Sequence, residues 1–209
     1  LVACCHVDDY KNNLIRKHEK TRQVKEDDRT NHVLGLRANS GPVFLTYQGQ
    51  HAIDTIVEEE MNKRPMFHFV ADDGVTHTGW RVIREEELCT ACESIELAYV
   101  ADGHHRSASA ARAAATLAEN NPNHTGEEEY NWFLTVLFPA NQLHILPYNR
   151  IVFDLQGSTV DEFLENLQEV GNVTPTSNPI PSTSGTCCVY VGKESGWHEL
   201  VFHSIDVDD

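Results

Sequence analysis

A polar stretch between an apolar segment and an alanine-rich segment holds the residues with the clearest chemistry. Residues 102–106 read Asp-Gly-His-His-Arg and follow the apolar stretch from Ile95 to Val100, which predicts a buried strand. Gly103 permits a sharp turn, and the helix predicted after it offers unpaired backbone N–H groups and the positive end of its dipole. Arg106 can donate two hydrogen bonds to phosphate oxygens, and the two histidines add donors. We therefore predict a phosphate- or nucleotide-binding turn formed by Asp102, Gly103, His104, His105, Arg106 and Ser107.

An ordinary strand-to-helix turn is the alternative for this stretch, because an Asp-Gly pair before a helix is common. Two histidines and an arginine within one helical turn favour the anion site. Ser107 fits either interpretation, since its hydroxyl can cap the helix or donate to a phosphate.

A second polar cluster begins at His18-Glu19 and is continued by cationic and acidic side chains over the next ten residues. A carboxylate beside a histidine and several cations can stay ionised and act as a general base. In phosphoryl transfer such a base takes the proton of the attacking hydroxyl. The alternative is a solvated helix face with charge pairs at i,i+4 spacing. The other members of the cluster are Thr21, Lys25, Asp28 and Arg29.

Residues 99–106, Tyr-Val-Ala-Asp-Gly-His-His-Arg, resemble the signature of the free serine kinases and that of a large bacterial family, domain of unknown function 1015. Both are related to the ParB and sulfiredoxin group, in which the corresponding Gly-x-x-Arg element holds phosphate. The strings at 41–44 and 146–150 also resemble the unknown-function family, so the likeness covers most of the chain. Asn149 stands where that family usually has histidine.

The resemblance implies roles for the second cluster. The serine kinases have a His-Glu pair that supplies the proposed catalytic carboxylate, which assigns Glu19 as the base and His18 as its support. It also implies that the chain is truncated at both ends, because the family has roughly a hundred further residues before this start and a later Pro-Lys-Ser/Thr-Thr segment. The resemblance to the unknown-function family alone assigns supporting roles to five further residues: Thr21, Lys25, Asp28, Arg29 and Arg150.

Hydrophobic periodicity and turn residues predict a mixed α and β fold. With the resemblance, we expect an α/β (α+β mixed sheet) protein with a ParB/sulfiredoxin-like core at residues 1–150, followed by part of a second α/β region at 151–209. The predicted strands are 1–7, 42–47, 95–100, 132–138, 145–153, 188–191 and 200–203, with a hairpin at 66–83 around Asp73-Gly74. The predicted helices are 51–63, 85–92, 107–120 and 159–170, with a loop leading into a helix at 12–31 and a loop at 174–185.

The composition excludes several classes of protein. The formal net charge of −16, from 32 acidic and 16 basic residues, disfavours nucleic acid as a partner. No apolar run could span a bilayer and the start does not resemble a signal peptide, so we expect a cytoplasmic protein without a membrane partner. The six cysteines fall in three close pairs, and Cys89-x-x-Cys92 lacks a second matching pair for zinc. We predict that they are structural.

The sequence thus predicts a kinase-like phosphotransferase that uses ATP or ADP with Mg²⁺ and a small hydroxylated acceptor, with free serine as the example. Two alternatives remain: a nucleotide hydrolase or switch of the ParB type, and a nucleotide- or phosphate-binding module without catalysis. The sequence leaves the metal ligands, the acceptor, the choice between ADP and ATP, and the oligomeric state open.

Overall fold

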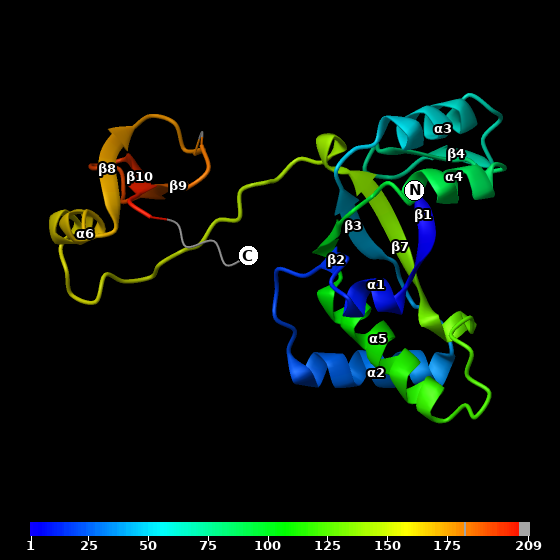
Figure 1. Ribbon diagram of the computed structural model, residues 1–209. Helices are drawn as coiled ribbons and strands as arrows, with labels where there is room; N and C mark the ends of the chain where they lie inside the picture. Colours follow the sequence, from blue (N-terminus) through cyan, green and yellow to red (C-terminus); the bar gives the residue numbers. More distant parts are fainter. Residues whose placement is uncertain (182, 205–209) are drawn as a thin grey trace. The chain divides into compact units, whose positions relative to one another are not determined.

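The computed structural model describes residues 1–181 and 183–204 (Figure 1). The chain forms two compact units, Leu1–His144 and Ile145–Asp209. Each unit combines helices with β-strands, so the predicted mixed α and β class is confirmed. No helix in the described residues is long and apolar enough to cross a membrane.

A five-stranded sheet of mixed direction forms the centre of the first unit. Its strand order is β1 (Val2–His6), β7 (Trp132–Pro139), β3 (Val43–Tyr47), β6 (Ala98–Asp102) and β2 (Ile15–Arg16). The β1–β7 and β3–β6 pairs are antiparallel, whereas β3–β7 and β2–β6 are parallel. Alternate side chains of the central strands are buried, as expected for a sheet covered on one face by helices.

Helices α1 (Val7–Lys11) and α5 (His104–Glu119) lie against this sheet, and α2 (Gln23–Leu36) packs on α5 (Figure 1). Alanines and serines make up most of the buried part of α5, and their small size lets α2 approach closely. Ser109 donates to the carbonyl of Glu26 at 3.3 Å, and Arg112 bonds the carboxylates of Glu26 and Asp27. These bonds tie the first half of α2 to the middle of α5, where the two helices cross (Figure 1).

A small peripheral layer consists of α3 (His51–Met61), a hairpin and α4 (Glu85–Cys92). The hairpin strands are β4 (Phe67–Val70) and β5 (Thr76–Gly79), and Gly74 has the positive φ of 82° that its turn requires. The predicted hairpin is thus confirmed. Two short 3₁₀ helices, Glu129–Asn131 and Ala140–Gln142, flank β7.

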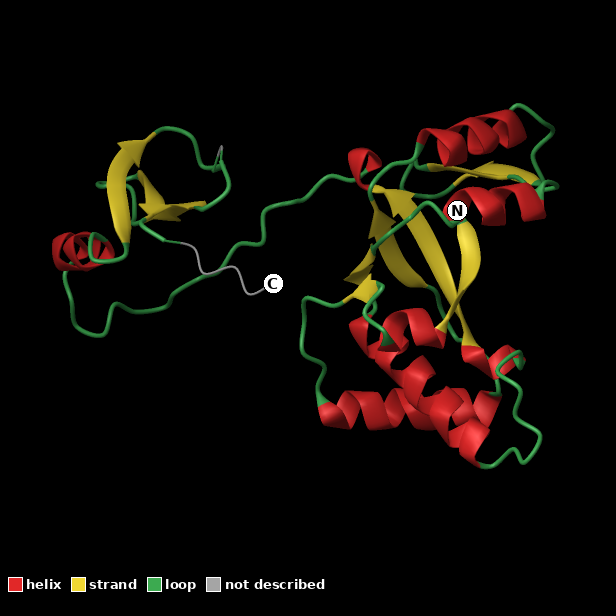
Figure 2. Cartoon of the chain, viewed as in Figure 1, coloured by secondary structure: helices red, strands yellow, loops and turns green. Residues whose placement is uncertain are grey.

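In its described residues, the second unit contains one helix and a three-stranded antiparallel sheet (Figure 2). The helix is α6 (Val160–Leu167), and Thr159 and Glu162 form a capping box at its start. The strand order is β8 (Gly171–Thr176), β10 (Trp197–Phe202) and β9 (Thr186–Tyr190).

Some predicted elements differ from the structure. Residues 145–153 form no strand, and Ile145 and Phe153 are 93% and 94% exposed. Their apolar and β-branched composition suits a strand, but a strand forms only when a neighbouring edge pairs with it. The predicted loop at 174–185 overlaps the end of strand β8. Helix α5 begins at His104, three residues before the predicted start at Ser107. The short elements α1 and β2 were not predicted.

Candidate functional site

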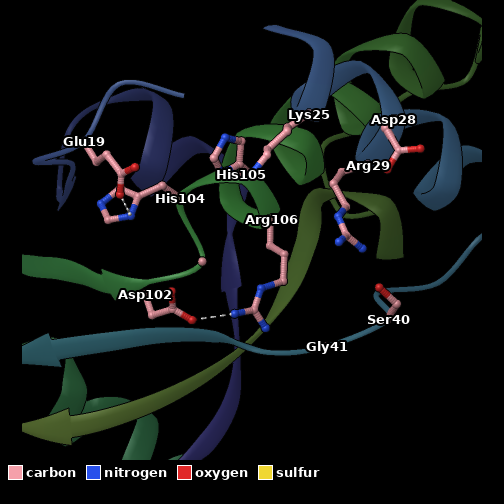
Figure 3. A pocket seen from close by; sticks show the side chains of 11 residues that line it. Glu19, Lys25, Asp28, Arg29, Ser40, Gly41, Asp102, His104, His105 and Arg106 are labelled. Atoms are coloured by element: carbon pink, nitrogen blue, oxygen red, sulfur yellow. Dashed lines mark hydrogen bonds and ion pairs between the residues drawn. The ribbon is translucent and has the colours of Figure 1, made fainter. Parts of the chain in front are cut away.

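A pocket of about 580 Å³ opens where α5 begins (Figure 3). Four segments of the first unit surround it: the turn from β6 into α5, the loop between β2 and α2, the face of α2, and the loop that leads into β3. Charged and polar side chains dominate its walls. The residues that line it are Glu19, Lys25, Asp28, Arg29, Ser40, Gly41, Asp102, Gly103, His104, His105 and Arg106.

The turn that forms one wall is shaped by an irregularity in β6. Phe44 of β3 pairs with Asp102, but the next residue of β3, Leu45, pairs with Val100, so one residue of β6 is left over. A β-bulge of this kind bends a strand and redirects its side chains. Gly103 follows with a left-handed φ of 97° and is the N-cap residue of α5. A glycine cap has no side chain, and no side chain among the described residues caps α5, so the first N–H groups of the helix, beside the pocket, lack a capping group.

Arg106 is held in place from two sides. Its Nη2 donates to Asp102 Oδ2 at 2.8 Å, and its Nη1 donates to the carbonyl of Pro42. Glycines stand where side chains would crowd it: a Cβ would lie 3.3 Å from Nη1 at Gly41 and 3.1 Å from Nε at Gly103. The remaining guanidinium N–H groups stay available, because the side chain has five. Asp102 therefore orients the arginine, and its own negative charge does not suit it to direct contact with phosphate.

Helix α2 brings two cations and one carboxylate to the pocket. Lys25, Asp28 and Arg29 share one face of α2 because their spacing is i, i+3 and i+4. The neighbouring carboxylates Glu26 and Asp27 bind Arg112 at 3.2 and 2.7 Å. In the described part of the chain neither Lys25 nor Arg29 makes an ion pair, although acidic residues outnumber basic ones two to one, 32 against 16. The pocket thus offers uncommitted cations to an anion.

Glu19 and His104 face each other at the rim of the pocket (Figure 3). Glu19 Oε2 lies 3.7 Å from His104 Nδ1, and the Glu19 side chain is 62% exposed whereas that of His104 is 5% exposed. The His18 ring meets the His104 ring edge to face, with 4.4 Å between centroids. Burial, and next the charge of His18, lower the pKa of His104 below its ordinary 6.5, although Glu19 and Asp102 act in the opposite direction. These surroundings therefore favour the neutral form of His104 over the charged form.

The family model for Protein of unknown function (DUF1015) matches residues 1–206, which includes both units. The chain belongs to the DUF1015 family. No curated protein and no solved structure matches the chain.

Most of the site residues predicted for this DUF1015 chain lie together. Glu19, Lys25, Asp28 and Arg29 line the pocket with the turn at 102–106. His105 lies against the start of α2, where its Nε2 accepts from the N–H of Arg22 at 3.2 Å.

Four predicted residues do not line the pocket of the DUF1015 chain. His18 packs against His104, and Thr21 donates to the Glu26 carboxylate. Ser107 is fully buried, and its hydroxyl donates to the carbonyl of His104 at 3.0 Å and does not cap α5. Arg150 belongs to the second unit, where its guanidinium lies 3.8 Å from the centroid of the Tyr148 ring.

The loop before β3 supplies two pocket residues, Ser40 and Gly41, that the sequence did not assign to the site. The available signal was the string at 41–44, which resembles the unknown-function family. Nothing in its residue types indicated a ligand, because a Ser-Gly-Pro turn occurs in many loops.

Proposed function

We propose that this chain is a nucleotide-dependent phosphotransferase that acts on a small hydroxylated metabolite such as free serine. The observation that carries the proposal is the composition of one pocket. Uncommitted cations and the start of α5 lie on one side of it, and the exposed carboxylate of Glu19 lies on its rim. Phosphoryl transfer needs these two parts: positive groups around the transferred phosphoryl group, and a base beside the attacking hydroxyl.

On the phosphate side, the proposed ligands are the first N–H groups of α5, the free N–H groups of Arg106, and the side chains of Lys25 and Arg29. A helix start attracts anions through its unpaired N–H groups and its dipole. Arg106 suits a planar, bidentate contact, whereas Lys25 contributes a point charge. Asp102 keeps the guanidinium oriented before the ligand arrives.

On the acceptor side, Glu19 takes the proton of the acceptor hydroxyl. The hydroxyl oxygen then forms a bond to the terminal phosphorus, and the bond from that phosphorus to the leaving nucleotide oxygen breaks. The exposed position of Glu19 lets an acceptor reach it from solvent. General-base assistance of this kind contributes on the order of a hundredfold to ten-thousandfold in rate.

Magnesium fits the pocket as part of a metal–nucleotide complex. The described residues contain no cluster of three side chains able to hold a metal ion. Mg²⁺ in nucleotide sites typically keeps several waters and binds phosphate oxygens with one or two carboxylates, and Asp28 and Asp102 line the pocket. A bound ion would neutralise part of the phosphate charge.

The direct test is an assay of the full chain with ATP or ADP, Mg²⁺ and serine, compared with a Glu19→Gln variant. We expect turnover to fall by roughly a hundredfold or more, while nucleotide affinity measured by calorimetry stays the same. Glu119→Gln, at the other end of α5, is the matched control and should leave turnover unchanged.

Other outcomes would replace the proposal. Unchanged turnover in Glu19→Gln would remove the carboxylate from the mechanism. Phosphate release without an acceptor would indicate a hydrolase or switch, and nucleotide binding without any turnover would indicate a binding module.

A further inference from the structure

The ring of His104 is buried but neither of its nitrogens has a hydrogen-bond partner within ordinary distance. Nε2 is shielded from solvent and has no partner among the described residues. Nδ1 lies 3.7 Å from Glu19 Oε2, slightly beyond hydrogen-bond distance. Buried polar atoms are rarely left in this state, because an unsatisfied group costs free energy. The surroundings of the two ring nitrogens therefore restrict which protonation state of His104 is favourable.

Three protonation states are available to an imidazole, and the surroundings disfavour two of them. The doubly protonated ring places an N–H without an acceptor at Nε2, inside the protein and beside His18. The neutral ring with its proton on Nε2 has the same buried N–H, and it also turns the Nδ1 lone pair toward a carboxylate oxygen. The neutral ring with its proton on Nδ1 directs that N–H toward Glu19 and leaves a lone pair at Nε2.

We propose that His104 is a positioning residue, whose Nδ1–H donates to Oε2 of Glu19 and fixes that carboxylate at the rim of the pocket. Glu19 is the exposed partner and can rotate by the small amount that brings the two atoms into hydrogen-bond distance. Hydrogen bonds of this type are often long before the substrate binds. With Oε2 held by His104, Oε1 stays free to accept a proton.

The charged neighbours of the ring are consistent with this arrangement. His18 and His105 oppose a positive charge on His104, whereas Glu19 and Asp102 favour it. Burial has the largest effect on the His104 pKa and lowers it. A neutral ring that donates from Nδ1 keeps the negative charge on Glu19, where a base needs it.

The hydrogen bond can be tested without any enzymatic assay. Nitrogen-15 NMR of the full chain at pH 7.5 distinguishes the two neutral forms of a histidine ring, because a protonated nitrogen and a lone-pair nitrogen have different chemical shifts. We expect the Nδ1–H form at His104, and a shift of that equilibrium toward Nε2–H in Glu19→Gln, in which the carboxylate charge is lost. A spectrum of the unsubstituted chain with the proton on Nε2, or a doubly protonated ring at this pH, would overturn the proposal.

Two substitutions separate positioning from a structural role. The amide nitrogen of asparagine can replace Nδ1, whereas that of glutamine reaches the position of Nε2. We expect the kcat of His104→Asn to stay within a few-fold of that of the unsubstituted chain. His104→Gln should lower kcat by roughly tenfold or more and leave KM unchanged, because a hydrogen bond to a charged group is lost. Equal losses in both variants would contradict the positioning role.

The role of His104 in turnover rests on the proposed function, but the hydrogen bond itself does not. If the full chain shows no phosphotransfer with any acceptor, the proposed function fails while the NMR experiment still decides the bond. If turnover is present and the proton is on Nε2, the inference about His104 fails and the proposed function stands.

Discussion

At the scale of single residues, the site depends on how a few cations are kept free in a strongly acidic chain. Arg106 is oriented by Asp102 and by the carbonyl of Pro42, and two glycines leave room for its guanidinium. On α2, two of the acidic residues near Lys25, Glu26 and Asp27, are paired with Arg112, whereas Asp28 lies in the pocket with Lys25 and Arg29. The positive charge that faces the pocket is therefore a consequence of pairing elsewhere on the same two helices.

The orientation of Arg106 leads to a prediction about its replacement by lysine. A lysine keeps the charge but cannot bond Asp102 and Pro42 and still present planar donors outward. We expect Arg106→Lys to weaken the binding of ATP with Mg²⁺ by roughly tenfold to a hundredfold, as for loss of one or two charge-assisted hydrogen bonds. Isothermal titration calorimetry measures this change.

Arg112→Lys is the matched control for this experiment. It lies on the same helix and in a network of ion pairs, but it does not line the pocket. It should lower the free energy of unfolding by about 1 kcal/mol or less, because Arg112 is partly exposed, and leave nucleotide affinity unchanged. Similar losses of affinity in both variants would indicate that α5 responds to any replacement of an arginine by lysine, and not that Arg106 contacts the ligand.

At the scale of secondary-structure elements, the turn between β6 and α5 carries a conformation that few residues accept. Gly103 has a φ of 97°, and a Cβ there would lie 3.1 Å from Arg106 Nε. We expect Gly103→Ala to lower the free energy of unfolding by about 1–3 kcal/mol and to weaken nucleotide binding as well, because the guanidinium has to move. Urea denaturation and calorimetry measure the two effects.

Gly35→Ala provides the comparison for the glycine substitution. Gly35 lies in α2, and a Cβ there would have no atom within 4 Å. Alanine should therefore raise the free energy of unfolding by about 0.5–1 kcal/mol, which is the usual difference between the two residues inside a helix. If Gly103→Ala is also neutral or stabilising, the turn does not need its left-handed conformation.

The same elements show how far the sequence predicts this structure. The hairpin around Gly74 and the helix after Asp102 were predicted correctly, because turn residues and helix-forming residues act locally. The strand predicted at 145–153 was wrong, since strand formation depends on a partner edge that composition does not reveal. The bulge before Asp102 and the approach of Ser40 to the pocket were not predicted either, because both arise from pairing between strands distant in sequence.

At the scale of the whole molecule, the family match and the candidate site have different extents. The DUF1015 match covers residues 1–206, but every residue that lines the pocket lies before residue 107, within the first unit. Between the last 3₁₀ helix and α6 the chain has neither helix nor strand, and it exposes large apolar side chains such as Tyr148 and Phe153. Exposed segments of this kind are the preferred sites of proteolytic cleavage.

Brief digestion with chymotrypsin should therefore cut the chain between residues 145 and 158 and release the first unit intact, which mass spectrometry can verify. We expect the purified fragment to bind ATP with Mg²⁺ with the affinity of the full chain, because it keeps the complete pocket. Cleavage after Tyr148 removes Arg150, which the resemblance marked as a supporting residue. The fragment that ends at Tyr148 is therefore the one to purify, and Arg150→Ala in the full chain is the matched control. Weaker binding in both would show that Arg150 contributes to the site. Weaker binding in the fragment alone would place another contact in the second unit. Equal affinity in all three would assign nucleotide binding to the first unit and leave the second unit to act on the acceptor or on a partner.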